Sequence, residues 1–249
     1  MIEVRDLSFS YHRGGQILKN LSVVLAPGEV VNILGSNGCG KTTFLKIILG
    51  LLPIEPATVF INGQPLEQFK RHQLAHLLAY VPQAHNGIFN YTVREMVLMG
   101  RTSASPWYRF SAEDEKKTRT VLKRVRLNAL ADRSYLEISG GEKQLVLIAR
   151  ALVQDSSFLI MDEPVNGLDY GNQFRLLTII RELADTGLAI VLTTHHPEQA
   201  VFLGGRALLI KNGHLVADGP TDQIITADAV TRLYDLPPAL LDQTKHFAS

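Results

Sequence analysis

Short apolar runs separated by turn residues predict strands in the first part of the chain. The runs cover residues 7–11, 17–25, 30–34 and 59–61, and the last of them ends at the turn pair Asn62-Gly63. Runs of this length, bounded by glycine and asparagine, are typical of strands joined by tight turns. We therefore expect mostly antiparallel β-structure in this part of the chain.

Helical patterns follow the next apolar run, at residues 77–81. Thr92 and Glu95 have the spacing of a capping box ahead of the apolar residues 96–99, and Ser111 opens a charged amphipathic stretch that continues through Arg126. These signals predict a helical lobe from about residue 84 to residue 154.

A strand, a helix and a second strand alternate after that lobe. The strands are expected at residues 158–161 and 189–193, with the helix at residues 173–185 between them. This alternation is typical of a parallel α/β sheet. Residues 207–217, with Asn212-Gly213 at their centre, predict a β-hairpin with a type I′ turn.

A glycine-rich segment lies between the predicted strand 30–34 and a helical stretch at residues 43–49. Its residues are Gly35, Ser36, Asn37, Gly38, Cys39, Gly40, Lys41 and Thr42, which fit the pattern G-x-x-x-x-G-K-[ST]. In this pattern backbone N–H groups wrap phosphate oxygens, the lysine reaches the β- and γ-phosphates, and the hydroxyl binds Mg²⁺. The strand-loop-helix setting therefore predicts a nucleotide phosphate site.

Two carboxylates, Asp162 and Glu163, follow the buried apolar run 158–161. The carboxyl ends of parallel strands are where open α/β sheets bind ligands. Asp162 is placed to hold Mg²⁺, and Glu163 to polarise the water that attacks the γ-phosphate. The alternative is an acidic strand end that only caps a turn at Pro164.

His195 follows the apolar strand 189–193 and Thr194, so it is expected at the neighbouring strand end. From there it can donate a hydrogen bond to the γ-phosphate or orient the attacking water. The adjacent His196 is the weaker candidate for the same contact, and a histidine in a loop can also be a structural residue only.

The composition suits one large globular unit or two closely joined lobes. The chain has 249 residues, of which 46% are hydrophobic and 20% charged, and its formal net charge is +1. A nearly neutral chain gives no reason to expect nucleic acid or an anionic membrane surface as a partner. No run reaches the roughly 18 apolar residues of a membrane helix, and the N-terminus lacks a signal-peptide core.

Cys39 is the single cysteine of the chain and lies inside the phosphate loop. With no second cysteine to pair with, it is consistent with a reducing, intracellular setting. We interpret it as a small filler, with a redox switch as the alternative.

The motifs together closely resemble the ATP-binding subunits of ATP-binding-cassette (ABC) transporters over nearly the whole chain. The resemblance rests on the phosphate loop, Gln83, Ser139-Gly140-Gly141-Glu142, Asp162-Glu163, Asn166-Gly167-Leu168-Asp169 and Thr194-His195, in this order. It implies a P-loop NTPase α/β fold, with a RecA-like core, an N-terminal antiparallel β-subdomain and an inserted helical subdomain. Residues 1–83 and 155–219 then form the core with the β-subdomain, residues 84–154 the helical signature subdomain and residues 220–249 a short helical tail, all within one domain.

The resemblance also implies a head-to-tail pair of copies, each holding ATP between its own phosphate loop and the signature segment of the other. Helix-terminal amides and a serine hydroxyl suit a γ-phosphate. The implied nucleotide contacts are Tyr11, Gly35, Ser36, Asn37, Gly38, Cys39, Gly40, Lys41, Thr42, Thr43, Ser139, Gly140, Gly141, Glu142 and Asp169. The implied Mg²⁺ contacts are Thr42, Gln83 and Asp162, and the implied catalytic residues are Lys41, Gln83, Glu163 and His195.

Three positions depart from the usual family pattern. Glu142 stands where glutamine is common, Val165 where a small hydroxyl residue is usual, and Asn166-Gly167 where serine-alanine is frequent. None of them removes a phosphate or metal ligand. Glu142 adds a negative charge near a polyanion, which weakens closure unless Lys143 offsets it.

Residues 97–101 and 106–110 resemble the helical lobe of importers for metal chelates and oxyanions, meaning siderophores, haem, cobalamin or molybdate. The expected function is an ATP-hydrolysing subunit at the cytoplasmic face of the inner (cell) membrane, working with a transmembrane permease and, indirectly, an external substrate-binding protein. Trp107, Tyr108 and Phe110 are then a docking surface for the permease, or else an ordinary hydrophobic patch.

Two other classes of protein carry some of these motifs. A soluble ABC ATPase that acts on a protein scaffold, as in iron-sulfur cluster assembly, has the same nucleotide motifs and a similar length. A small-molecule kinase also has a phosphate loop, but it has no use for Ser139-Gly140-Gly141. The transported solute is not encoded in these motifs.

Overall fold

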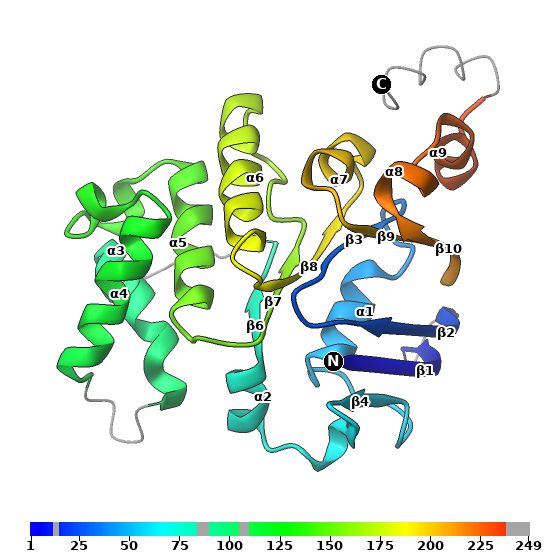
Figure 1. Ribbon diagram of the computed structural model, residues 1–249, viewed down its shortest axis with the longest axis horizontal. Coiled ribbons are helices and arrows are strands. Elements are labelled where there is room, and N and C mark those ends of the chain that lie inside the picture. The colour runs from blue at the N-terminus through cyan, green and yellow to red at the C-terminus, as the bar shows by residue number, and fades with distance from the viewer. Residues whose placement is uncertain (12–14, 84–89, 105–109, 238–249) are drawn as a thin grey trace.

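Two β-sheets organise the computed structural model, which describes residues 1–11, 15–83, 90–104 and 110–237 (Figure 1). A small antiparallel sheet has the strand order β2-β1-β4-β5, and a six-stranded sheet has the order β10-β9-β3-β8-β7-β6. The strands of the small sheet are β1 (Ile2–Ser10), β2 (Gln16–Leu25), β4 (Val59–Ile61) and β5 (Gln64–Pro65). Those of the large sheet are β3 (Val30–Leu34), β6 (Leu78–Val81), β7 (Phe158–Asp162), β8 (Ala189–Thr194), β9 (Arg206–Lys211) and β10 (His214–Pro220).

The large sheet is parallel except at one edge. β3 pairs in parallel with both β8 and β9, and β7 pairs in parallel with β8 and β6, whereas β10 runs antiparallel to β9. The registers place Leu34 beside Thr194 and Asp162 beside Thr193. The carboxyl ends of β3, β8 and β7 therefore meet at one edge of the sheet, which is where the phosphate loop begins.

Nine α-helices and four short 3₁₀ segments connect these strands in the described part of the chain. The helices are α1 (Lys41–Ile48), α2 (Arg71–Leu77), α3 (Val93–Leu98), α4 (Ala112–Arg124), α5 (Gly140–Leu152), α6 (Tyr170–Ala184), α7 (Pro197–Leu203), α8 (Thr221–Ile224) and α9 (Ala227–Tyr234). The 3₁₀ segments are Leu66–Gln68, Met99–Ala104, Asn128–Leu130 and Tyr135–Glu137. In Figure 1, α3, α4 and α5 form a helical group on the left, while α1 and the small sheet lie on the right.

The hydrophobic core has two main parts, one on each side of the large sheet. One joins α3, α4, α5 and α6 to β6, β7 and β8, and the other joins α1 and the small sheet to the opposite face. No helix among the described residues is long and apolar enough to cross a membrane. The division of the chain at residues 84, 155 and 220 stays a prediction.

Most predicted elements are confirmed, and the capping signals explain their ends. Thr92 caps α3 and Ser111 caps α4, in each case by accepting a backbone N–H three residues later. The predicted hairpin turn is also present, with left-handed φ angles of 52° at Asn212 and 83° at Gly213. This is the backbone of a type I′ turn.

Several element boundaries differ from the sequence prediction by one or more residues, and three of the differences have a clear physical reason. β1 begins at Ile2 rather than residue 7, because a register shift between Val4 and Leu7 breaks the alternation that marks a strand. α4 ends at Arg124 rather than Arg126, since Arg126 has a left-handed φ of 63°. α6 begins at Tyr170, three residues early, because Asp169 is its N-cap.

Candidate functional site

The phosphate loop leaves the end of β3 and turns directly into α1. Gly40 caps α1 with a φ of 108°, which a residue with a side chain rarely adopts. At Gly35 a Cβ atom would lie 2.3 Å from the backbone oxygen of Ile210 in β9. The two glycines are therefore required by the backbone path and by its close packing against the sheet.

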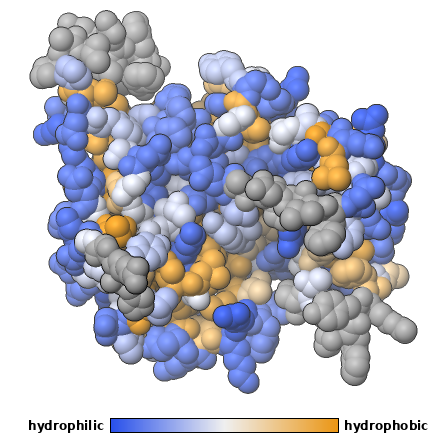
Figure 2. Space-filling view, turned by 180° about the vertical axis from the view of Figure 1, so that it is seen from behind, coloured by the Kyte–Doolittle hydropathy of each residue, from blue (hydrophilic) through white to orange (hydrophobic). Residues whose placement is uncertain are grey.

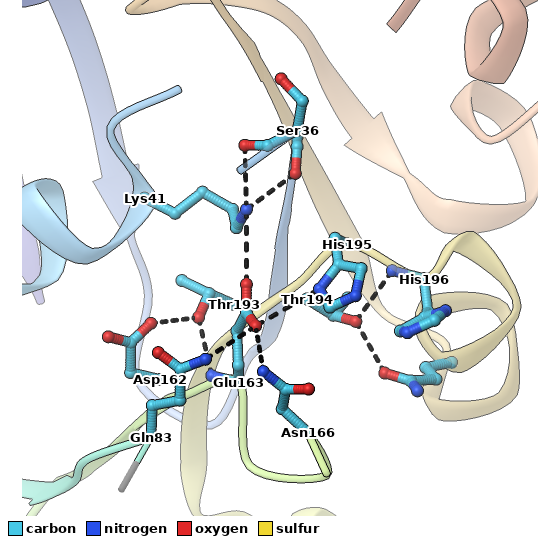
Figure 3. A network of polar contacts seen from close by, with 12 residues as sticks. Ser36, Lys41, Gln83, Asp162, Glu163, Asn166, Thr193, Thr194, His195 and His196 are labelled. Atoms are coloured by element: carbon cyan, nitrogen blue, oxygen red, sulfur yellow. Dashed lines mark hydrogen bonds and ion pairs between the residues drawn. The ribbon is translucent and has the colours of Figure 1, made fainter. Parts of the chain in front are cut away.

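Lys41 extends along the inside of this loop. Its Nζ donates hydrogen bonds to the carbonyl oxygens of Gly35, at 2.7 Å, and Ser36, at 3.2 Å, and lies 3.6 Å from Glu163 Oε1 (Figure 3). The side chain is only 5% exposed, so these oxygens are what compensates a buried positive charge. The ammonium group thus lies where the oxygens of an incoming phosphate could replace these carbonyl oxygens as its hydrogen-bond partners.

Glu163 is the centre of the polar network in Figure 3. Its Oε2 accepts hydrogen bonds from Gln83 Nε2 at 3.2 Å and Asn166 Nδ2 at 3.1 Å, and lies 3.3 Å from His195 Nδ1. Its backbone has a left-handed φ of 45°. Such a conformation in glutamate is a local strain that aims the side chain out of the strand end and into the loop cavity.

Asp162 is held by a residue that the sequence prediction missed. Thr193 Oγ1 donates to Asp162 Oδ1 at 2.6 Å and accepts the backbone N–H of Glu163 at 2.9 Å. One buried hydroxyl on β8 thus orients both carboxylates at the end of β7. The only signal in the sequence is a pair of threonines at the end of an apolar strand. Threonine is common in strands because its β-branched side chain packs well there, so this pair does not indicate a hydrogen-bonding role. Burial and the charge of Asp162 also raise the pKa of Tyr80 to about 12.

Replacing Thr193 with valine is expected to disturb both carboxylates with little change of shape. Asp162 Oδ1 and the Glu163 N–H would lose a buried partner, so the free energy of unfolding should fall by about 1–3 kcal/mol and hydrolysis by roughly tenfold. Denaturant unfolding and ATP turnover measure the two effects. Thr231→Val, which removes a hydroxyl bonded to the Ala227 carbonyl of α9, is the control and should leave turnover unchanged. Unchanged turnover in Thr193→Val would contradict the role of this hydroxyl.

The structure separates the two neighbouring histidines. His195 points to Glu163 (Figure 3). His196 Nδ1 instead lies 3.1 Å from Glu198 Oε1. The His195 Nδ1 atom is buried and forms no hydrogen bond within the described residues. Thr194 stabilises the turn after β8 that contains both histidines, because its Oγ1 accepts a hydrogen bond from the backbone N–H of His196. This placement favours His195 as the site residue, as the sequence predicts.

Two of the departures from the family pattern have structural roles. Asn166 donates a hydrogen bond from its side-chain amide to Glu163, so it belongs to the network, a role that was not predicted from the sequence. Val165 is 4% exposed and lies in the core beside α5 and α6. The apolar side chain of Val165 therefore contributes to the hydrophobic core at this position.

The remaining residues predicted at this half-site surround the same space. Tyr11 Oη lies 3.4 Å from Thr43 Oγ1, and the Tyr11 ring stays 44% exposed at the rim. A cavity of about 420 Å³ is lined by Thr42 and Gln83 together with residues of the loop. Its lining is Ile17, Asn37, Gly38, Gly40, Lys41, Thr42, Thr43, Gln83, Glu163 and Asn166.

The thiol of Cys39 is buried, and this burial raises its pKa. Its Sγ lies within 2.5 Å of where a Cβ of Gly35 would be, so the side chain packs under the loop backbone. A protonated, buried thiol is a poor nucleophile, which favours the interpretation of Cys39 as a filler.

A helix of the C-terminal tail also reaches the phosphate loop. The Tyr234 hydroxyl, at the end of α9, is buried without a hydrogen-bond partner among the described residues. Burial raises its pKa, and the charges of Cys39 and Glu163 add to the shift while the backbone of Gly35 opposes it. Tyr234 also packs against the apolar cluster that contains Leu34, the last residue of β3 before the loop, which the helical pattern of the sequence alone did not indicate.

The residues predicted for Mg²⁺ fit the way this ion is bound in phosphate sites. Among the described residues no group of three or more His, Cys, Asp or Glu side chains could hold a metal ion without other ligands. Mg²⁺ keeps several waters and is bound by few side chains together with substrate phosphates. The oxygens of Thr42, Gln83 and Asp162 match that donor set.

The signature segment forms a second half-site at the start of α5. Ser139 caps the helix, and Gly141 packs so closely on α6 that a Cβ there would lie 2.9 Å from Asn172 Cγ. Asn172 in turn donates its backbone N–H to Asp169 Oδ1 at 3.0 Å and its side-chain amide to Asp169 Oδ2 at 2.6 Å. These hydrogen bonds lower the pKa of Asp169, so the residue stays ionised beside the signature segment.

The two half-sites do not meet within one chain. A cavity of about 230 Å³ touches Ser139, Gly141 and Glu142, and it shares no lining residue with the cavity at the phosphate loop. In Figure 1, α6 and strands β7 and β8 lie between α5 and α1. Of the predicted docking residues, Trp107 and Tyr108 lie outside the described part of the chain, and Phe110 is at the surface.

Comparisons with known proteins agree with this geometry. The family model described as ABC transporter matches residues 18–166. An uncharacterised ABC transporter ATP-binding protein of Haemophilus influenzae is 37% identical over 98% of this chain and 92% of its own. The hemin import ATP-binding protein HmuV of Nocardia farcinica is 34% identical over 92% of this chain and 81% of its own.

A solved structure described as a metal-chelate type ABC transporter in an inward-facing conformation is also similar. It superposes with a TM-score of 0.83 and 30% identity, covering 95% of this chain and 89% of that chain. The chain therefore belongs to the ABC transporter family, as an ATPase subunit with the family's P-loop α/β fold.

Proposed function

We propose that this protein is the ATP-hydrolysing subunit of an importer, and that two copies close head to tail on ATP to drive a separate transmembrane permease. The observation that carries the proposal is the separation of the two half-sites, each with its own cavity in one chain. A second copy is the simplest source of the missing half. Contacts made with ATP and lost with ADP would then make closure depend on the nucleotide.

Glu163 is proposed as the base that polarises the attacking water. Its carboxylate lines the loop cavity and accepts hydrogen bonds from Gln83 and Asn166, with His195 Nδ1 3.3 Å away, while Thr193 holds its backbone. A base held in this way needs no reorganisation when the water loses its proton. His195, at the next strand end, would donate a hydrogen bond to the γ-phosphate or orient the water.

Lys41 and the loop amides would bind the phosphates. Lys41 donates hydrogen bonds to two carbonyl oxygens of the loop, and it would exchange these for β- and γ-phosphate oxygens. Thr42, Gln83 and Asp162 would hold Mg²⁺, which neutralises developing charge on the phosphate oxygens. At the rim, the Tyr11 ring is exposed and free to stack on the adenine.

An apolar surface supports the proposed permease contact. Figure 2 shows hydrophobic side chains gathered in the lower middle of the face, where α1 and α2 lie. Leu51 there is 60% exposed, and Leu52, Ile54 and Leu74 are half-buried. Exposed apolar patches of this kind mark interaction sites on many proteins. The subunit would then be peripheral, at the cytoplasmic face of the cell membrane.

The proposed cargo is a metal chelate or an oxyanion such as molybdate. The support is similarity to a hemin importer subunit and to a metal-chelate type transporter. The cargo would pass through the permease after delivery by an external substrate-binding protein, and it would not touch this chain. The nearly neutral net charge adds no reason to expect nucleic acid as a partner.

Recovery of the tagged protein from detergent-solubilised membranes tests the proposal. We expect it to bring down two hydrophobic, many-helix partner subunits, and we expect addition of cargo-loaded binding protein to raise ATP turnover of that complex. Recovery of soluble scaffold proteins instead, with none in the membrane fraction, would contradict the importer and favour a scaffold-directed ATPase.

A further inference from the structure

Both hydrogen-bond donors of Ser139, in the signature segment, are already engaged within this chain. Ser139 donates its backbone N–H to Glu142 Oε2 at 2.7 Å and its hydroxyl to the same oxygen at 2.8 Å. The Glu142 backbone N–H returns a bond to Ser139 Oγ at 3.3 Å. This is a complete capping box at the start of α5.

A carboxylate at this place stabilises the helix and fills its anion site at the same time. The positive end of the helix dipole and the free N–H groups attract one negative group, and Glu142 supplies it from within the chain. The Ser139 N–H, with the Ser139 hydroxyl, lowers the pKa of Glu142, so the group is ionised at neutral pH.

No neighbouring cation forms an ion pair with Glu142 in the described part of the chain. Lys143, the expected counter-charge, points elsewhere: its Nζ lies 3.3 Å from the Leu136 carbonyl oxygen and 5.8 Å from the centre of the Tyr135 ring. Arg133 contributes only a longer-range attraction to Glu142. The sequence-based hypothesis that Lys143 offsets this charge therefore has no support in the structure.

We propose that Glu142 competes with the γ-phosphate of the nucleotide on the second copy for the Ser139 hydroxyl, and so weakens closure of the ATP-bound pair. This inference rests on the proposed head-to-tail function. A serine hydroxyl has one proton to donate, so the carboxylate has to release it when a phosphate oxygen arrives. The Glu142 carboxylate and the γ-phosphate would also repel each other, because both are negative and both would lie next to the Ser139 hydroxyl. In a symmetric pair of copies this repulsion occurs at both nucleotide sites.

The same geometry occurs a second time in the chain and provides a matched control. At the start of α3, Thr92 donates its N–H at 2.7 Å and its hydroxyl at 2.8 Å to Glu95 Oε2. The Glu95 backbone N–H returns a bond to Thr92 Oγ1 at 3.2 Å. Glu142→Gln and Glu95→Gln therefore remove the same charge from the same kind of helix cap, but only the first lies in the signature segment.

The dimer dissociation constant in saturating Mg-ATP tests the proposal, measured by sedimentation in the hydrolysis-blocked Glu163→Gln protein. We expect Glu142→Gln to tighten the pair by roughly tenfold or more, because the amide oxygen still caps the helix without the charge. Glu142→Asp, which keeps the charge, and Glu95→Gln should each change the constant by less than about twofold. Thermal unfolding of all variants confirms that they are folded.

The outcomes separate this inference from the function on which it rests. If the Glu163→Gln protein pairs with ATP but Glu142→Gln does not tighten the pair, or if Glu95→Gln tightens it equally, only the competition is wrong. If no variant pairs in Mg-ATP, the proposed function fails and the inference fails with it. Pairing of the Glu142→Gln variant alone would support both.

Discussion

Replacing Glu163 with glutamine is expected to leave ATP binding intact while hydrolysis falls by about 10²–10⁴-fold. The amide keeps the size of the side chain, and its oxygen can still accept a hydrogen bond from Gln83 or Asn166. It cannot take a proton from water. Single-turnover hydrolysis and equilibrium ATP binding, measured on the same preparation, separate the two effects.

Glu198→Gln is the matched control for this prediction. Glu198 is a carboxylate from the neighbouring helix α7, but it pairs with His196, and neither residue lines the loop cavity. Its replacement should change turnover by less than about twofold. Undiminished hydrolysis in Glu163→Gln would remove Glu163 from the mechanism.

Replacing Lys41 with alanine is expected to weaken ATP binding by about 2–5 kcal/mol, which is roughly 30-fold to several thousand-fold. The buried ammonium group is the only lysine or arginine side chain among the described residues that line the loop cavity. Without it, phosphate oxygens would lose their charged partner, and Glu163 would keep an uncompensated charge facing them.

Lys46→Ala controls for loss of a lysine from the same helix. Lys46 lies in the last turn of α1 and does not line the loop cavity. Isothermal titration with ATP should give wild-type affinity for Lys46→Ala and weak or no binding for Lys41→Ala. Unchanged affinity in the Lys41 variant would contradict the assignment of the loop.

The sequence predicts the nucleotide half-site well because its chemistry is local. A phosphate loop needs glycines and a lysine within eight consecutive residues, and the apolar runs on either side define the strand and the helix. The carboxylates of Asp162 and Glu163 could be placed in the same way, since they follow a fully apolar strand. The structure brings Lys41, Glu163 and His195 together as these patterns predict, and Gln83, which only the family resemblance indicated, bonds to Glu163 beside them.

Residues that act through long-range contacts were not found from the sequence. Thr193 holds both carboxylates, but a threonine in a strand has many other uses. Asn166 was known only as a departure from a family pattern, and Tyr234 only as part of a helical tail. His195 and His196 differ in role only because the turn after β8 points them in different directions. These contacts depend on which strand ends are neighbours in the folded sheet.

Glu142 shows how a helix cap and a ligand site can use the same atoms. The structure contains a capping box with glutamate at its third helical position at α3, where the spacing of Thr92 and Glu95 predicts it, and another at α5. What distinguishes them is the resemblance of Ser139-Gly140-Gly141 to a signature that contacts nucleotide. The proposed competition gives the permease a role, because contacts with it could supply the closure energy that the isolated pair lacks.

The most direct test is the mass of the Glu163→Gln protein in solution, or bound to its permease, with and without saturating Mg-ATP. If each nucleotide is held between two copies, the 27.6 kDa protein should form a dimer of twice that mass when ATP is bound. A Ser139→Arg variant should remain monomeric under the same conditions. A subunit that remains single with ATP bound, in solution and on the permease, would contradict the shared site.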